Sequence, residues 1–189
     1  IFAGAHFGNW EIAGALVAFD YPLTVIQETF SNHEANELFR RIRAAKNITA
    51  VQLGKAAKPA LLALRRNEIL GLLVDRPTSD SGIEVEFFGQ RTRIPGGIAK
   101  LAMRSGAPIV VGGAIRNRDR TYSVIGYPPI YPDSNLSPNV DAARITQALM
   151  GRIEAMIRRR PDQWYMFREM WPGDSTCRGV AGQAIGSQA

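Results

Sequence analysis

Residues 1–18 read IFAGAHFGNWEIAGALVA, and this stretch sets the fold that the rest of the chain has to follow. The apolar run 1–5 predicts a buried strand. Gly8 permits a sharp turn after this strand, and Asn9 is a favoured N-cap for the helix predicted over 9–18. A buried strand joined to a helix by a few residues is the first half of a βαβ unit.

The alternation of strand and helix continues along the chain and predicts an α/β fold. Because buried strands that alternate with helices form parallel sheets covered on both faces, we expect a single domain with a mostly parallel central sheet flanked by helices. Further strands are predicted over 23–27, 49–53, 69–74, 85–88, 109–114 and 122–125, and further helices over 34–45, 56–66, 97–104 and 139–159.

The length of the chain, 189 residues, suffices for one domain with a sizeable core. We expect this domain to span 1–172 and, because the chain begins inside a predicted strand, to be truncated at its N-terminal end. Residues 173–189 lack large aromatic side chains and are mostly small or polar, so we expect a disordered tail there. The longest apolar runs fall short of the roughly 18 residues that span a bilayer.

The composition is that of a globular protein with a basic surface. Hydrophobic residues make up 46% and charged residues 21%, which disfavours disorder, collagen-like repeats and coiled coil. Lys and Arg number 23 against 17 Asp and Glu, giving a net charge of +6. Such a charge suits nucleic acid, phospholipid headgroups or phosphate-bearing small molecules. The single cysteine, Cys177, excludes an internal disulfide and a cysteine-based metal cluster.

His6 and Glu11 are the first candidates for chemistry. On one continuous helix, residues five apart point about 140° away from each other, so the two meet only if His6 ends the strand and Glu11 lies in the first helical turn. An ionised carboxylate beside an imidazole orients the ring and makes it a competent general base. The alternative is a core histidine with an ordinary first-turn acid.

Other chemistries lack a motif. His33 is the only other histidine and no H-E-x-x-H pattern occurs, so we expect no metal. Neither a G-x-S-x-G nucleophile motif nor a nucleotide-binding glycine motif is found. The sequence thus offers a candidate general base, His6, but no candidate nucleophile within the protein. That describes direct transfer to an external acceptor, or hydrolysis by activated water.

Several blocks of the sequence together resemble a known family. The blocks are GAHFGNWE at 4–11, SN at 31–32 followed by three arginines, GLLVDR at 71–76, EVEFFG at 84–89, PGG at 95–97 and RPDQWYMF at 160–167. In this order they resemble the bacterial lipid A biosynthesis acyltransferases over 1–172. That family has a glycerolipid acyltransferase-like fold and includes lipid A lauroyl and myristoyl transferases and phosphatidylinositol mannoside acyltransferases.

The resemblance implies transfer of a fatty acyl chain to a hydroxyl of a membrane glycolipid, of lipid A precursor or phosphatidylinositol mannoside type. The donor would be an acyl thioester, acyl-ACP or acyl-CoA, used as a co-substrate without a further cofactor. If the functional residues of the family are transferred to the matching positions of this chain, His6 would be the general base and Glu11 its partner in an HX4E motif. The implied substrate-binding residues are Gly8, Asn9, Arg43 with Arg40 and Arg41 as alternatives, Asp75 and Arg76.

The segment EVE at 84–86 differs from the lipid A enzymes and resembles the phosphatidylinositol mannoside acyltransferases. The pair Asp75-Arg76, where lipid A enzymes have Asp-Gln, also resembles that branch. The resemblance implies a second active-site carboxylate in this segment. Glu86 is favoured because it directly precedes FFG, with Glu84 as a competitor. The alternation around Val85 equally allows both carboxylates to lie on a solvated strand face.

The expected partners are a glycolipid acceptor, the acyl thioester and an anionic membrane surface, but not nucleic acid. The expected location is the cytoplasmic face of a bacterial inner membrane, with the protein peripheral or anchored by a missing N-terminal segment. Two other functions stay open at this point. One is an acyl-thioester hydrolase, and the other is a non-catalytic basic module that binds anionic membrane or nucleic acid.

Overall fold

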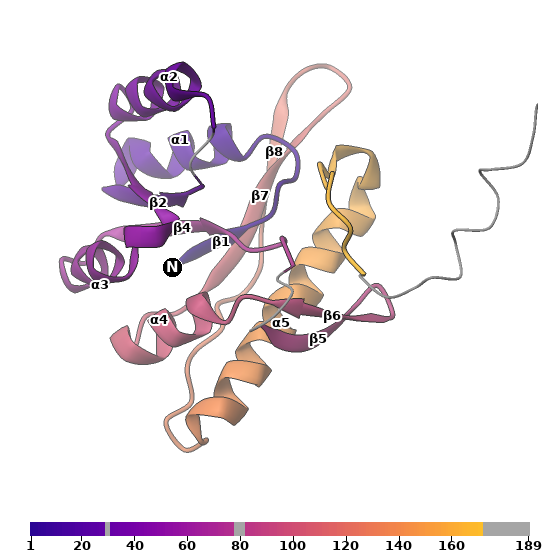
Figure 1. The fold of residues 1–189 in the computed structure, drawn as a ribbon. Coiled ribbons are helices and arrows are strands. Elements are labelled where there is room, and N and C mark those ends of the chain that lie inside the picture. The colour runs from indigo at the N-terminus through magenta and orange to yellow at the C-terminus, as the bar shows by residue number, and fades with distance from the viewer. Residues whose placement is uncertain (29–30, 78–81, 172–189) are drawn as a thin grey trace, which may run out of the picture.

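The computed structural model describes residues 1–28, 31–77 and 82–171 and has a six-stranded central sheet (Figure 1). The strand order is β3-β2-β4-β1-β7-β8; the first five are parallel and β8 is antiparallel to β7. The predicted α/β fold with a mostly parallel sheet is therefore confirmed. The tail predicted at 173–189, with Cys177, lies outside the described residues. The strands of this sheet are β1 (Phe2–Gly4), β2 (Leu23–Gln27), β3 (Ile48–Gln52), β4 (Ile69–Leu73), β7 (Val110–Arg116) and β8 (Tyr122–Gly126).

The helices agree with the predicted ones to within two residues at each end. Asn9 and Asn32 cap α1 and α2, because each side chain accepts a hydrogen bond from the backbone N–H three residues later. Gly106 ends α4 with a φ of 70°, in the left-handed region. The helices are α1 (Trp10–Asp20), α2 (His33–Ala44), α3 (Ala57–Arg65), α4 (Gly97–Ser105) and α5 (Pro138–Arg159), with short 3-10 turns η1 (Leu53–Lys55) and η2 (Pro161–Gln163).

The sequence analysis missed one strand. In place of a single strand over 85–88, β5 (Ile83–Phe87) and β6 (Gln90–Ile94) form an antiparallel hairpin outside the main sheet. Phe88 and Gly89 make its turn with φ of 55° and 77°, as a tight hairpin turn requires. β6 escaped prediction because arginines occupy its outward positions, leaving little apolar signal.

The main core lies where α4, α5 and the β5–β6 hairpin pack against the sheet. α5 contributes one fully buried face, with Ile145, Leu149 and Ile153 inaccessible to solvent. A smaller cluster packs α1 through Ala18 onto Leu23 and Ile48 at the starts of β2 and β3. These contacts hold the parallel strands in register, and the register decides which residues meet at the carboxyl edge of the sheet.

Replacing Leu149 by Ala is expected to lower the free energy of unfolding by about 2–5 kcal/mol, because it leaves a cavity in the main core. Leu16→Ala, a matched change on the exposed face of α1, should alter the free energy of unfolding by only about 0.5 kcal/mol or less. Urea unfolding monitored by circular dichroism measures both. Similar losses in the two variants would contradict the placement of the core.

Candidate active site

His6 and Asp75 meet at the carboxyl edge of the sheet. β1 pairs with β4 so that Gly4 lies opposite Leu73. Two residues further on, His6 therefore lies beside Asp75. The imidazole Nδ1 is 2.8 Å from Asp75 Oδ1, and the backbone N–H of His6 donates to Oδ2 at 2.9 Å. This edge is where open parallel sheets bind their ligands.

The Asp75 carboxylate is buried but well satisfied. It has no solvent exposure, and it also accepts a hydrogen bond from the indole N–H of Trp164 at 3.0 Å. Burial acts to raise the pKa of Asp75, but the hydrogen bonds and charge of His6, with the Trp164 bond, outweigh burial and hold the pKa below its ordinary value. Asp75 is therefore ionised, and its Oδ1 can accept a hydrogen bond from an N–H at His6 Nδ1.

This arrangement leaves the other imidazole nitrogen available. With its proton on Nδ1, a neutral His6 has a lone pair on Nε2. Among the described residues no hydrogen bond engages Nε2, and the His6 side chain is 15% exposed. An imidazole held by a buried carboxylate and open at Nε2 can take a proton from a hydroxyl group or a water molecule.

The turn after β1 has the predicted shape and is held by the C-terminal segment. Gly8 has a φ of 58° and donates its N–H to the Gln163 carbonyl, and the Asn9 N–H donates to the Ala114 carbonyl. The His6 carbonyl accepts from the Tyr165 N–H at 2.7 Å. The backbone N–H groups of Gly8 and Asn9 are thus engaged within the protein, so their part here is to fix the turn.

Glu11 has a partner other than His6. The structure pairs it with Arg43 of α2, whose Nη2 is 2.5 Å from Glu11 Oε1, and the same guanidinium also donates to Gln27 at the end of β2. The predicted pairing of His6 with Glu11 is thus not what the structure shows, since Asp75 takes that place. Glu11 does lie in the first turn of α1, as expected, and there it fixes an arginine.

The other predicted basic residues divide into two groups. Arg40 and Arg41 lie on the exposed side of α2, where both pair with Glu37 of the same helix. Arg76 directly follows Asp75 and donates to Glu28, which follows β2 and is also contacted by Arg168. Arg43 and Arg76 therefore lie at the carboxyl edge of the sheet, whereas Arg40 does not contact the residues described there.

Glu84 and Glu86 lie on the exposed face of the β5–β6 hairpin. Val85 and Phe87 occupy the inward positions of the same strand and are buried. Glu84 pairs with Arg91 across the hairpin, and the backbone of Glu86 bonds to the Gln147 side chain. Neither carboxylate forms a hydrogen bond with His6 or Asp75. The alternation around Val85, left open by the sequence, places both on the solvated face.

The C-terminal aromatic residues have two separate surroundings. Trp164 and Trp171 pack with Phe87 and Phe88 of the hairpin. From His6 a different series of ring contacts runs outward through Trp10, Tyr165 and Phe167, with successive centroids 5.5, 5.8 and 6.5 Å apart. Phe167 at its end is 90% exposed. A row of contacting aromatic rings thus extends from His6 to the protein surface.

The role of Trp164 was not predicted from the sequence. Its position in the RPDQWYMF block marked it as part of a family motif, but only the fold brings its indole N–H to Asp75. One signal could have suggested this contact. A largely buried tryptophan needs an acceptor for its N–H, and Asp75 is a polar residue at the end of a buried strand.

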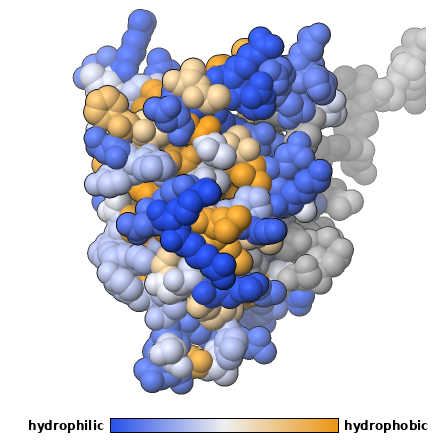
Figure 2. Space-filling view, turned by 90° about the vertical axis from the view of Figure 1, so that its left-hand side faces the viewer, coloured by the Kyte–Doolittle hydropathy of each residue, from blue (hydrophilic) through white to orange (hydrophobic). Residues whose placement is uncertain are grey.

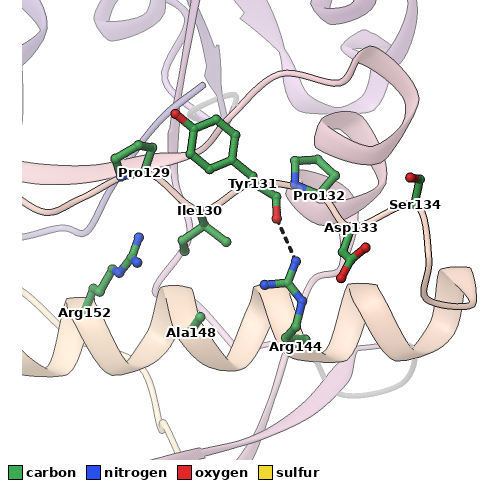
Figure 3. A pocket seen from close by; sticks show the side chains of 9 residues that line it. All are labelled: Pro129, Ile130, Tyr131, Pro132, Asp133, Ser134, Arg144, Ala148 and Arg152. Carbon is green, nitrogen blue, oxygen red and sulfur yellow. Dashed lines mark hydrogen bonds between the residues drawn. The ribbon is translucent and has the colours of Figure 1, made fainter.

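A recess of about 510 Å³ lies elsewhere, between the segment 129–134 and α5 (Figure 3). Arg144 on its wall donates to the Tyr131 carbonyl, and Arg152 donates to the Pro128 carbonyl. None of the residues that line the recess is a predicted site residue. In the described part of the chain, no group of three or more His, Cys, Asp or Glu side chains is arranged to hold a metal ion.

Comparison with known proteins agrees with the resemblance of the sequence blocks. Residues 1–172 match the family model described as bacterial lipid A biosynthesis acyltransferase. The chain belongs to this family of acyltransferases. No helix within the described ranges is long and apolar enough to cross a membrane.

Two relatives are phosphatidylinositol mannoside acyltransferases. The one from Mycolicibacterium smegmatis is 30% identical over 187 residues, and the one from Mycobacterium tuberculosis is 31% identical over 180 residues. The matches cover 92% of this chain in both cases, and 57% and 55% of the two relatives. The chain therefore spans a little over half the length of these relatives.

Gly8→Ala is expected to destabilise the turn and to abolish any activity that depends on His6. An added Cβ would lie 2.0 Å from the Ala114 carbonyl oxygen, in a backbone contact that cannot give way. Gly89→Ala is the matched control, since its φ is 77° and its added Cβ would meet nothing within 4 Å. The control should cost only the left-handed backbone strain, about 1–2 kcal/mol. Equal unfolding free energies for the two variants in urea would contradict this account of the turn.

Proposed function

We propose that this chain carries the catalytic domain of an acyltransferase that moves a fatty acyl chain from an acyl thioester to a hydroxyl of a membrane glycolipid. The observation that carries the proposal is the His6–Asp75 pair, with Nε2 open, at the carboxyl edge of the sheet in a member of this family. Its relatives' names favour a phosphatidylinositol mannoside acceptor over a lipid A precursor.

In the proposed reaction His6 is the general base. Nε2 takes the proton from the acceptor hydroxyl as its oxygen attacks the thioester carbonyl, and Asp75 stabilises the imidazolium that forms. The tetrahedral intermediate then collapses, the C–S bond breaks, and the thiolate leaves with the proton returned from His6. Because the thioester is already activated, the reaction needs neither a metal nor a cofactor besides its acyl-CoA or acyl-ACP co-substrate.

Charge that develops on the carbonyl oxygen requires hydrogen-bond donors already in place. The backbone N–H groups of Trp10 and Glu11, in the first turn of α1, have no partner within the helix, and among the described residues no other acceptor engages them. We assign these two N–H groups the task of binding the oxyanion of the tetrahedral intermediate. Arg43, held by Glu11 and Gln27, and Arg76, beside Asp75, are assigned to the phosphate groups of donor or acceptor.

The roles of the remaining predicted residues follow from their surroundings. Gly8 and Asn9 shape the turn, and Glu11 positions Arg43. Glu86, with its exposed side chain, is assigned no part in proton transfer. The enzyme would work at the cytoplasmic face of the inner membrane, where a basic surface and the exposed ring of Phe167 suit an anionic lipid layer.

The proposed chemistry is tested by supplying radiolabelled palmitoyl-CoA, and separately palmitoyl-ACP, with extracted bacterial glycolipids. Wild type should label a glycolipid band. His6→Ala and Asp75→Asn should lower kcat by about 10²- to 10⁴-fold, because each removes a working base. Glu86→Gln, the control carboxylate, should leave kcat unchanged.

Each other result of that assay contradicts part of the proposal. Free fatty acid without labelled lipid identifies a thioester hydrolase. If Asp75→Asn keeps its turnover and Glu11→Gln loses it, then Glu11 and not Asp75 is the partner of His6. No turnover with either donor contradicts the catalytic proposal itself and favours a module that only binds.

Trp164→Phe should lower kcat about tenfold with little change in KM, because it removes one hydrogen bond to the charged Asp75 and keeps the aromatic ring. Trp171→Phe is the control. Its indole N–H donates to the Phe87 carbonyl in the same aromatic cluster, but it does not contact Asp75. Steady-state kinetics of both variants measure the effect. Equal losses of kcat would mean that Trp164 acts only through packing.

A further inference from the structure

Two arginines meet on one carboxylate at the carboxyl edge of the sheet. Glu28 directly follows β2, and its Oε2 accepts one hydrogen bond from Arg76 Nη1 and another, at 3.2 Å, from Arg168 Nη2. Arg76 lies 48 residues and Arg168 140 residues further along the chain than Glu28. The fold, and not the local sequence, therefore brings the two guanidinium groups side by side.

Both arginines have hydrogen-bond donors to spare. A guanidinium carries five N–H groups, and within the described part of the chain Arg76 and Arg168 each use a single nitrogen, on Glu28. Arg43 differs, because all three of its nitrogens donate to side chains of the protein. Its side chain is also only 13% exposed, against 32% for Arg76 and 54% for Arg168. An anion can therefore be bound by Arg76 and Arg168 without breaking the ion pair of Arg43.

Charge and exposure alone do not mark a binding site on this protein. Figure 2, which looks onto the side of Figure 1 with α1, α2 and α3, shows hydrophilic side chains over most of that face. Glu37 of α2 is also shared by two arginines, but these lie on its own helix, three and four residues further on. Arg76 and Arg168 differ from that pair, because they come from separate segments that both hold His6.

The two segments reach His6 from different sides. Arg76 directly follows Asp75, whose carboxylate bonds to the imidazole. Arg168 lies three residues after Tyr165, whose backbone N–H donates to the His6 carbonyl. A group bound between the two guanidinium groups would therefore lie on the same edge of the sheet as the imidazole, where a substrate of the proposed reaction has to bind.

A phosphate group suits this pair of arginines. The planar fork of a guanidinium binds the oxygens of a carboxylate and of a phosphate in the same way, and a phosphate has enough oxygens to accept from both arginines at once. In the free protein the Glu28 carboxylate occupies the position of such an anion. Because exposed ion pairs contribute little free energy, a substrate phosphate can displace Glu28 at small cost.

We propose that Arg168 is a substrate-binding residue which, together with Arg76, binds a phosphate group of a substrate in place of the Glu28 carboxylate. Arg168 thereby adds a second cation to the phosphate contact already assigned to Arg76. This deepens the proposed function, on which it rests for the identity of the substrates. The phosphate belongs either to the acyl donor, as in CoA, or to the phosphodiester headgroup of the glycolipid, and kinetics distinguish these two sources.

Steady-state kinetics of Arg168→Gln, with palmitoyl-CoA and glycolipid varied in turn, test the proposal. The KM of the substrate whose phosphate is bound should rise about tenfold, with little change in kcat, because the contact is made equally in the ground state and the transition state. The substrate whose KM rises is the source of the phosphate. Arg66→Gln is the matched control and should leave both KM values unchanged. Arg66 is 64% exposed and pairs with Glu68, but it precedes β4 at the opposite edge of the sheet.

Titration calorimetry of the full chain with CoA, and separately with glycerophosphoinositol, measures binding without turnover. Arg168→Gln should weaken the binding of one of these probes about tenfold. Arg168→Lys should weaken it less, because lysine keeps the charge but lacks the planar fork. Glu28→Gln should strengthen the binding of the same probe, by up to about fivefold, because it removes the competing charge. Opposite effects of two substitutions in one ion pair do not arise from misfolding.

Unchanged KM values and unchanged probe binding in Arg168→Gln would overturn the proposal, as would wild type that binds neither probe or equal effects of Arg66→Gln. Weaker binding by Glu28→Gln would overturn the displacement of Glu28. Failure of the proposed function is distinguishable, because His6→Ala should bind the probes like wild type. Binding that depends on Arg168 without any turnover would support the phosphate site and contradict the chemistry. Turnover that depends on His6 but not on Arg168 would do the reverse.

Discussion

The hydrogen bond between His6 Nδ1 and Asp75 Oδ1 depends on one structural constraint, the parallel register of β1 and β4. Because Gly4 lies opposite Leu73, the residues two positions later emerge side by side at the carboxyl edge. A slip of one residue would move one of the two side chains to the other face of the sheet. The packing of α4, α5 and the hairpin around β1 and β7 therefore matters to the chemistry as well as to stability.

The rest of the site holds this pair in place. Desolvation of the Asp75 carboxylate is offset by three hydrogen bonds, two from His6 and one from Trp164. The segment that supplies Trp164 also bonds the turn after β1, through the carbonyl of Gln163 and the N–H of Tyr165. Segments far apart in the sequence thus fix the imidazole before any substrate binds, which is what efficient proton transfer requires.

The fold was predictable from apolar periodicity, but the site was predictable only in part. His6 and Asp75 were both expected at strand ends, yet a sequence does not state which strands are neighbours. The nearby Glu11 was chosen as the partner of His6, whereas the observed partner is 69 residues away. The sequence favoured Arg43 and kept Arg40 and Arg41 as alternatives, and only the fold shows that Arg43 contacts Glu11 and Gln27. β6 was missed because its outward arginines masked the alternation.

The central claim is that a neutral His6 keeps its proton on Nδ1, facing Asp75, and its lone pair on Nε2. Long-range ¹H–¹⁵N NMR of the imidazole nitrogens tests this directly, and the chain has only two histidines to assign. The account predicts the Nδ1–H tautomer for His6 in wild type and its loss in Asp75→Asn. A neutral His6 protonated at Nε2, or a tautomer indifferent to Asp75→Asn, would contradict it.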